Sequence, residues 1–489
     1  MEAVLRMELD DLNIKSLGEV GVIPPLLKMV SGNIDSKELA LSALAKLSSC
    51  RENKKLIADS GGVPLILEQM FLSHVRTIIT ARCSEILERL TSNDGIEFLV
   101  NSDKTPLELD KIVTNLLSFQ QNKQISNTIR KPILHALLEI CRSDVGLVNK
   151  AILCANGVSI ILPLLDEREQ EIREVAINLL FCFSKHEPHG IVDFLLVQRR
   201  LAALVDVLKD DTRSHTQMAI AGLLANLPKS ETRLTEKLIE LDGLQAVLNI
   251  LISGTTEAKE NALGVLFRFT DPTNIEFQRM VVELGFYPLL VNFVKSGTLT
   301  AKGQAAALIG NLSSNSHKLT LMISKPKPTS FWCFRSVSVP ICEAHGGICS
   351  VTSTFCMLEA KALPEIISLF QEKVHATAYE GIQALSTLIY DEKPHSGAKV
   401  LHEADAISSI LEVLNWGTPS LKGEALSLLA KIFVTREFAE VYGSRARIHL
   451  GTLTTSNIHE GWQLGRKAAT VLTQLERYSR TSMSYRRGG

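Results

Sequence analysis

A short apolar motif recurs through this chain at intervals close to 43 residues, and this period limits the fold more than any other feature. The motif looks like half a helix, as in ILERL, LLANL, LIGNL and LLAKI. The residue before its final apolar position defines a set that we call the repeat column: Lys46, Arg89, Glu139, Cys182, Asn226, Arg268, Asn311, Thr387, Lys431 and Gln474. Most successive members lie 42 to 44 residues apart. Such a period predicts a solenoid of stacked helical repeats.

The composition agrees with stacked helices and excludes several classes of protein. Hydrophobic residues make up 45% of the 489 residues and aromatic residues only 5%. The net charge of −1 gives no bulk attraction to nucleic acid, so we expect no nucleic-acid partner. No apolar run is long enough to span a membrane, and the N-terminus lacks the basic region of a secretory signal. We therefore expect a cytoplasmic protein whose nine cysteines are thiols or metal ligands.

The first repeat shows how each unit is built. A turn at Gly21 precedes Pro24 and Pro25, which suit the first turn of a helix because proline lacks the N–H that is unpaired there. The following helix is predicted to carry Leu39, Leu41, Leu44 and Leu47 at near-helical spacing. Similar glycines recur at Gly61, Gly157, Gly243 and Gly285. Each repeat is thus predicted to contain a short helix, a glycine turn, a second helix and a longer third helix.

The repeats resemble the armadillo family. NKKLIADSGGVPLIL is similar to the first two helices of that repeat, and AIAGLLANLP and AAALIGNLSS are similar to the third. The resemblance implies an all-α fold, a right-handed α-solenoid of about ten armadillo repeats over residues 1–317 and 359–475. The 50-residue step from Arg89 to Glu139 indicates one degenerate repeat. HEAT repeats are the structural alternative, but the glycine turn and the asparagine in the third helix favour armadillo.

In armadillo proteins the third helices line a groove, and their asparagines clamp extended peptides. Only Asn226 and Asn311 match that pattern here, and no tryptophan precedes either. The column is otherwise mainly basic, at Lys46, Arg89, Arg268 and Lys431. Because a basic groove repels Lys- and Arg-rich cargo, the column argues against a nuclear-import receptor. It favours a protein partner with an acidic or polar segment. The alternative is that these long side chains are solvated, with their stems packed on the helix.

The largest break in the period marks an insertion over residues 318–358, which we expect to be irregular. It contains Cys333, Cys342, Cys349 and Cys356, with His345 among them. Thiolates and an imidazole suit tetrahedral zinc, although C-x2-H-x3-C lacks the second close pair that zinc sites usually have. The alternative is a loop whose cysteines pack as small apolar residues. The sequence leaves both interpretations open.

The insertion also resembles a more specific family. FWCF, the later C-x2-H-G-G-I-C pattern and the stretch leading into LEA look like the insertion of plant U-box armadillo E3 ubiquitin ligases of the senescence-associated type. The resemblance implies a scaffold that docks substrates or membranes in protein ubiquitination. We find no U-box, because residue 1 is already expected in a repeat helix. Two alternatives stay open: a fragment of a complete ligase, and an armadillo adaptor unrelated to ubiquitin.

The chain shows no known catalytic motif, and we expect no small-molecule substrate. Residues 476–489 form a basic tail that we expect to be disordered, with Arg477, Arg480, Arg486 and Arg487. Near an anionic bilayer each basic residue contributes about 1 kcal/mol of attraction. The tail therefore favours peripheral contact with the plasma membrane, and a solvated tail is the alternative.

Overall fold

The fold is all-α, as the period predicts. The computed structural model describes residues 11–73, 77–93, 96–101, 103–122, 124–143, 146, 151–152, 155–186, 188, 190–324, 341–390, 393–454 and 462–486. Within these residues every regular element is a helix, apart from an isolated antiparallel bridge between Val100 and Pro106. None of the helices described is both long and apolar enough to cross a bilayer.

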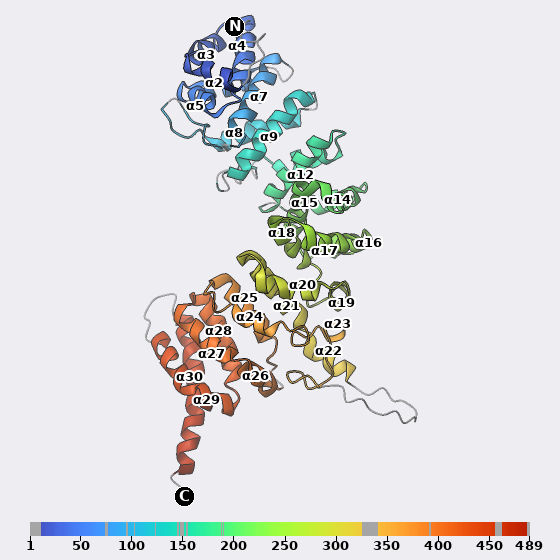
Figure 1. Ribbon diagram of the computed structural model, residues 1–489, viewed down its shortest axis with the longest axis vertical. Helices are drawn as coiled ribbons and strands as arrows, with labels where there is room; N and C mark the ends of the chain where they lie inside the picture. The colour runs from blue at the N-terminus through green and yellow to red at the C-terminus, as the bar shows by residue number, and fades with distance from the viewer. Residues whose placement is uncertain are drawn as a thin grey trace. The chain divides into compact units, whose positions relative to one another are not determined.

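The chain forms two compact units, unit 1 (Met1–Lys237) and unit 2 (Leu238–Gly489), with helices labelled in Figure 1. Unit 1 contains α2 (Asp11–Glu19), α3 (Ile23–Val30), α4 (Ile34–Leu47), α5 (Arg51–Asp59), α6 (Gly62–Leu72), α7 (Ile78–Thr91), α8 (Leu109–Gln121), α9 (Asn127–Ser143), α11 (Gly157–Ile161), α12 (Gln170–Ser184), α13 (Ile191–Leu195), α14 (Arg200–Leu208) and α15 (Ser214–Asn226), with the 3-10 helices Leu162–Asp166 and Asp211–Arg213. The helix α16 (Thr232–Glu240) contains the boundary between the units.

Unit 2 continues the same three-helix pattern. It contains α17 (Gly243–Ser253), α18 (Thr256–Leu266), α19 (Ile275–Glu283), α20 (Phe286–Ser296), α21 (Leu299–Ser313), α22 (Ser316–Ile323), α23 (Val351–Thr354), α24 (Leu363–Ser368), α25 (His375–Ser386), α26 (Pro394–Glu403), α27 (Ala406–Trp416), α28 (Pro419–Ile432), α29 (Arg436–Thr454) and α30 (Trp462–Arg486).

The last helix of each repeat, which we call the third helix, packs against its counterpart in the next repeat. In unit 1 these are α4, α7, α9, α12 and α15, and in unit 2 they are α18, α21, α25, α28 and α30. Each presents a stripe of fully buried residues, such as Leu41, Leu44 and Leu47 in α4. Leu39 is the exception, because it lies outside this stripe and is 37% exposed. Stacking thus buries apolar faces that no single repeat can bury alone.

Several third helices begin at a side-chain cap that satisfies an unpaired backbone N–H. The oxygen of Asn33 accepts from the backbone N–H of Ser36 at 3.0 Å. Thr77, Thr255, Thr298 and Thr418 make the same contact at the starts of α7, α18, α21 and α28. These caps fix where five of the third helices begin, namely α4, α7, α18, α21 and α28.

In the turns before the second helices, the residue with left-handed backbone conformation occurs at one of two positions. Gly21, Gly61 and Gly285 have φ of +83°, +70° and +86°, a left-handed conformation that glycine adopts without strain. In two other repeats the left-handed residue is Asn156 or Asp242, one position before the predicted glycine. The following Gly243 serves close packing instead, since a Cβ there would lie 2.8 Å from the Leu238 carbonyl oxygen.

Buried amide side chains link successive repeats. Asn53 Nδ2 on α5 donates to the carbonyl oxygens of Ile14 at 2.8 Å and Leu47 at 3.0 Å. Gln278 Nε2 on α19 donates to the carbonyls of Thr270 and Asn311, both at 2.9 Å. The carbonyls of Leu47 and Asn311 lie in the last turns of α4 and α21, where carbonyls lack partners within their own helix, and the two amides supply those partners.

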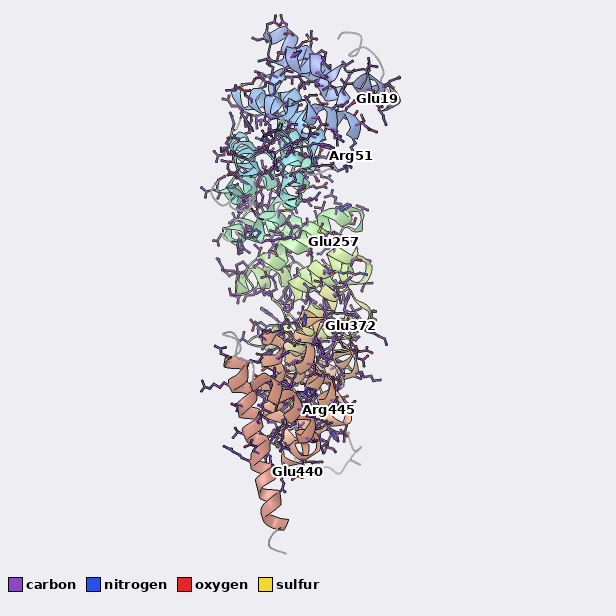
Figure 2. The ribbon with its side chains drawn as sticks, turned by 90° about the vertical axis from the view of Figure 1, so that its left-hand side faces the viewer. Glu19, Arg51, Glu257, Glu372, Glu440 and Arg445 are labelled. Carbon is purple, nitrogen blue, oxygen red and sulfur yellow. The ribbon has the colours of Figure 1, made fainter. Side chains whose placement is uncertain are left out.

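Ion pairs on the surface join neighbouring helices within each unit. Arg51 of α5 lies 2.5 Å from Glu97, and Arg445 of α29 is paired with Glu412 of α27. Figure 2 labels the two arginines. All four side chains are roughly half exposed or more. Exposed pairs of this kind contribute only about 0.2–1 kcal/mol each, so the apolar stack carries most of the stability.

The insertion lies inside one repeat, between its first helix α22 and its second helix α24. α22 extends to Ile323, so the helical pattern continues into the segment that we expected to be irregular from residue 318. The short α23 packs against α19 and α22. α21 and α25 still contact each other directly (Figure 1). The insertion therefore does not interrupt the stack of third helices.

The prediction of a disordered tail is wrong for residues 476–486, which belong to the helix α30. No glycine or proline occurs between Gly465 and Gly488 to end the helix. The side chain of Arg477 is exposed. The side chains of Arg480 and Arg486, and all of Arg487, lie outside the described part.

Candidate metal centre and third-helix surface

Four of the five predicted metal ligands converge on one point in unit 2. The donor atoms of Cys342, His345, Cys349 and Cys356 all lie within 4.8 Å of one another. His345 Nδ1 lies 3.4 Å from the sulfur of Cys342, 3.2 Å from that of Cys349 and 3.5 Å from that of Cys356. The sulfurs of Cys342 and Cys356 are 3.9 Å apart. The fifth predicted ligand, Cys333, lies outside the described residues.

A tight loop brings the first three donors together. The backbone N–H of Cys342 donates to the Gly347 carbonyl at 2.8 Å, and that of Gly346 donates to the Cys342 carbonyl at 2.7 Å. Gly346 has φ of +68°, which lets the chain reverse between His345 and Cys349. Gly347 sits against α22, because a Cβ there would lie 2.4 Å from Ser324 Oγ. The loop is thus closed on itself and seated on the first helix of its repeat.

Cys356 reaches the cluster through an unusual backbone conformation. Phe355, fully buried, has φ of +55°, a left-handed region that bulky residues rarely adopt. The Tyr287 hydroxyl on α20 donates to the Phe355 carbonyl at 3.3 Å. Strained residues persist only where the surrounding structure holds them in place. Here the packing of Phe355 turns the next residue, Cys356, toward the other three donors.

Two side chains from outside the cluster contact its members. His345 Nε2 lies 2.7 Å from the hydroxyl oxygen of Tyr390, which follows α25, and Thr320 Oγ1 of α22 lies 3.1 Å from the sulfur of Cys349. The Tyr390 ring also stacks on His317, with ring centroids 4.1 Å apart. No sequence pattern indicates these contacts, because Tyr390 lies 45 residues beyond His345 and Thr320 lies 29 residues before Cys349.

The cluster differs electrostatically from the cysteines packed singly in the core. Burial raises the pKa of Cys83 in α7 to about 12, as expected for a thiol surrounded by apolar atoms. Within the cluster, hydrogen bonds from Cys342 and Cys356 lower the pKa of Cys349. The same shared hydrogen bonds raise the pKa of Cys356. The arrangement therefore favours a thiolate at Cys349, the one half-exposed member of the cluster.

The repeat column follows the third helices, but its members differ in how far they reach solvent. Lys46, Arg89, Asn226 and Asn311 are half-buried, and Lys431 is exposed. Arg268 is only 3% exposed, so the expectation that it faces a groove is wrong. The helix α18 ends at Leu266, and the turn after it directs Arg268, Phe269 and Thr270 inward.

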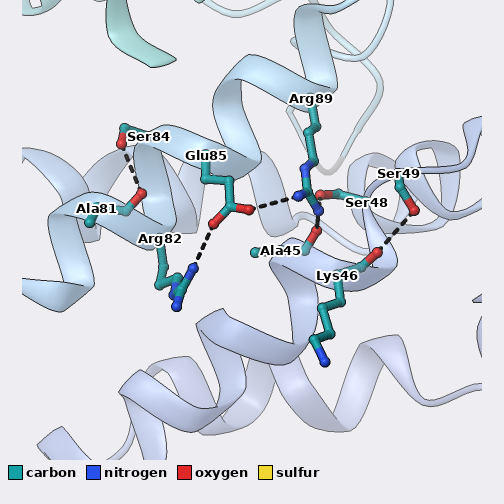
Figure 3. Close-up of polar contacts among 9 residues, drawn as sticks. All are labelled: Ala45, Lys46, Ser48, Ser49, Ala81, Arg82, Ser84, Glu85 and Arg89. Atoms are coloured by element: carbon teal, nitrogen blue, oxygen red, sulfur yellow. Dashed lines mark hydrogen bonds and ion pairs between the residues drawn. The ribbon is translucent and has the colours of Figure 1, made fainter. Parts of the chain in front are cut away.

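Two column residues link neighbouring third helices. The Arg89 guanidinium on α7 donates to the Ala45 carbonyl on α4 and lies 2.7 Å from Glu85 (Figure 3). Lys46 extends away from Arg89 in the same view. Asn226 Nδ2 on α15 donates to Ser184 Oγ on α12 at 3.0 Å. These polar groups thus have contacts within the protein, and Asn226 is not held ready to clamp a peptide backbone.

A hollow of about 170 Å³ lies on the third-helix surface of unit 1, between α9, α12 and α15. Its lining includes the column residue Cys182 together with Arg142, Lys185 and His186. Arg142 and Lys185 are exposed, and Lys185 Nζ also lies 5.0 Å from the centre of the Phe181 ring. The sequence analysis did not identify Arg142 and Lys185, because both lie beside the repeat column and do not belong to it. Arg142 also lies 2.9 Å from Glu139 on the same helix, so that pair is neutral and Lys185 gives the hollow its net positive charge.

Comparison with known proteins shows distant homology to plant U-box proteins over most of the chain. It is 28% identical over 454 residues to U-box domain-containing protein 44 of Arabidopsis thaliana, covering 84% of this chain and 55% of that protein. It is 26% identical over 460 residues to U-box domain-containing protein 43 of the same plant, covering 86% and 56%. U-box domain-containing protein 24 of Oryza sativa subsp. japonica is 26% identical over 467 residues, covering 85% and 56%. The chain thus spans about half the length of the curated relatives it matches.

A solved structure supports the fold alone. The chain is similar to the crystal structure of an engineered protein, with a TM-score of 0.60 and 18% identity, covering 93% of this chain and 98% of that one. No protein-family model matches the chain.

Proposed function

We propose that this chain is a protein-interaction scaffold, corresponding to the armadillo-repeat region of a U-box protein, and that it acts in protein ubiquitination by presenting a bound partner. The observation that carries the proposal is the alignment with plant U-box proteins over 84–86% of the chain in the first three relatives. The stack of third helices in each unit supports it, because a solenoid offers a long surface for an extended partner.

The partner surface that we propose is the third-helix face of unit 1, centred on the hollow lined by Arg142 and Lys185. Two exposed cations beside a concave surface favour an acidic or polar segment of another protein. Lys46 on the same set of helices and Lys431 in unit 2 add positive charge to the third-helix surfaces. Arg268 has no part in this proposal because it is buried.

Fluorescence anisotropy with a labelled Glu- and Ser-rich peptide tests this surface. The double variant Arg142→Glu/Lys185→Glu should weaken binding at least tenfold, and added salt should weaken binding to the original protein. Lys55→Glu/Lys209→Glu is the matched control, since both lysines are exposed and lie off the third helices. Equal binding by the two double variants, or tighter binding of a Lys- and Ser-rich peptide, would overturn the proposed surface.

Presentation can be separated from catalysis by an in vitro ubiquitination assay with purified E1, E2 and this chain. We expect no ubiquitin transfer, because the sequence contains no recognisable U-box or catalytic motif. Autoubiquitination by residues 1–489 would overturn this expectation, whereas a U-box encoded upstream in the same gene would favour the alternative, a fragment of a complete ligase. A ubiquitin-independent adaptor is distinguished by co-purification with a partner that is never ubiquitinated in cells.

Peripheral contact with the plasma membrane is a further proposal, which rests on the basic residues of α30 and the end of the chain. Flotation with vesicles containing phosphatidylserine tests it. Binding should be weak and should disappear in high salt. Salt-resistant binding, or equal binding to neutral vesicles, would rule out the electrostatic contact.

A further inference from the structure

We propose that Cys342, His345, Cys349 and Cys356 bind one zinc ion in a closed tetrahedral site, and that this ion fastens the insertion to the repeat formed by α22, α24 and α25. The proposal is independent of the partner surface, because it concerns residues in unit 2 that do not contribute to that surface.

Four of the six separations between the donor atoms are close to those around a single zinc ion, and none exceeds 4.8 Å. Sulfur at about 2.3 Å and nitrogen at about 2.1 Å from a tetrahedral zinc are separated from one another by about 3.6–3.8 Å. The four distances given above, between His345 Nδ1 and the three sulfurs and between Cys342 and Cys356, span 3.2–3.9 Å. One ion can therefore contact all four donors with only small movements of the side chains.

Packing alone does not account for this arrangement. Cysteines that fill space in a core contact carbon atoms, whereas these three sulfurs all point at one imidazole nitrogen. A neutral imidazole nitrogen can pair with only one hydrogen at a time. The backbone also holds Phe355 in a left-handed conformation to place Cys356 there. A metal ion bound by all four donor atoms explains why the three sulfurs surround one imidazole nitrogen. It also explains why Phe355 is held in a left-handed conformation.

The donor set selects the kind of ion. Three thiolates and an imidazole suit zinc, whereas calcium and magnesium require oxygen ligands. An iron–sulfur cluster contains more than one iron, so its ligands would be spread further than the 4.8 Å seen here. Four protein ligands leave no open position for water or substrate, which indicates a structural rather than a catalytic site.

The surrounding contacts are those expected around a bound metal. A ligating histidine usually donates its second N–H to an oxygen, and here the Tyr390 hydroxyl lies 2.7 Å from His345 Nε2. Thr320 Oγ1 lies 3.1 Å from the Cys349 sulfur. Through these contacts the ion would connect α22, the insertion loop and the segment after α25. Such a connection would replace the apolar stripe that the insertion lacks.

Metal analysis of the full 489-residue chain, expressed with zinc and purified under reducing conditions, tests the proposal. We expect about one zinc per chain after dialysis. Cys342→Ser and Cys356→Ser should each reduce this to near zero, while Cys50→Ser, a control from unit 1, should keep it. His345→Ala should lose zinc but His345→Cys should retain it, because a fourth thiolate can replace the imidazole as a ligand.

Cobalt provides a second measurement that does not depend on how the variants fold. Replacing zinc by Co²⁺ in the unaltered chain should give the intense visible absorption of tetrahedral thiolate coordination, and zinc should abolish it. The proposal fails if the metal-replete chain holds little zinc and shows no cobalt spectrum. It fails equally if Cys342 and Cys356 are recovered as a disulfide from reducing conditions, or if the serine variants keep their zinc.

Discussion

The repeat formed by α19, α20 and α21 and the repeat formed by α22, α24 and α25 are neighbours in unit 2, yet they are held together differently. The first buries a regular apolar stripe that includes Phe286, Tyr287 and Leu290. The second contains an insertion without such a stripe, which is held by the buried side chains of Phe355 and Met357 and by polar and sulfur contacts of a few other side chains. The comparison shows that a periodic segment is held by many small contacts, and a non-periodic one by a few specific contacts.

Leu312→Ala should have the largest effect on the regular repeat. Leu312 is fully buried in α21, and removing its side chain leaves a cavity that should cost about 2–5 kcal/mol of the free energy of unfolding. Urea denaturation followed by circular dichroism measures this loss. Leu299→Ala in the same helix is the control and should be nearly neutral, because Leu299 is 54% exposed. Equal effects of the two changes would show that the stripe does not stabilise the repeat.

Gly310→Val should disturb the contact between the two repeats. A Cβ at Gly310 would lie 3.2 Å from the Cα of Ala384 on α25, so valine should force α21 and α25 apart at a cost of about 1–3 kcal/mol. Gly303→Ala provides the contrast, since a Cβ there would meet Thr377 at an ordinary 3.8 Å. That change should be neutral or stabilising in thermal unfolding, because alanine favours helix over glycine. A destabilising Gly303→Ala would contradict this account of the interface.

Tyr390→Phe should affect the insertion but not the stack. The change removes the hydroxyl beside His345 Nε2 and keeps the ring that stacks on His317. Zinc affinity should fall about 10–100-fold, as is typical when a partner of a ligating histidine is lost. Competition with a coloured chelator measures the affinity, and urea denaturation of the zinc-loaded chain checks the fold. Unchanged affinity would mean that Tyr390 does not position the ligand.

Lys302→Met should give the smallest effect. Lys302 on α21 is paired with Glu372, labelled in Figure 2, and thus links the two repeats at their surface. Both side chains are partly exposed, so a double-mutant cycle with Glu372→Gln should show a coupling of about 0.2–1 kcal/mol that decreases in high salt. A coupling larger than the effect of Leu312→Ala would invalidate the view that apolar stacking dominates in the regular repeat.

The sequence predicted the third helices well because their burial follows the helical period directly. The prediction that Arg268 faces a groove was wrong, because α18 ends two residues before it and the period contains no information about where a helix ends. The sequence placed the turn at Gly243 one residue too late, since Asp242 can adopt the left-handed conformation as well. It also missed the continuation of α30, where composition indicated disorder although no residue breaks the helix.

The candidate metal centre was predictable only in part. Cys342, His345 and Cys349 are close in sequence, so a single loop can bring them together. The position of Cys356 depends on the conformation of Phe355, which in turn depends on packing against α20. Tyr390 and Thr320 come from helices that meet only in the folded protein. Contacts of this kind carry no local pattern, and the sequence therefore left both zinc and simple packing open.

The direct contact between α21 and α25 has a consequence for how such arrays can change in length. The inserted residues lie between the first and second helices of one repeat, and the third helices α21 and α25 remain in contact. The spacing of the third helices therefore does not depend on the length of the insertion. The connection between α22 and α24 is therefore a position at which we expect the fold to tolerate insertions. We expect segments of other sizes to be accommodated there without a change in how α21 packs on α25.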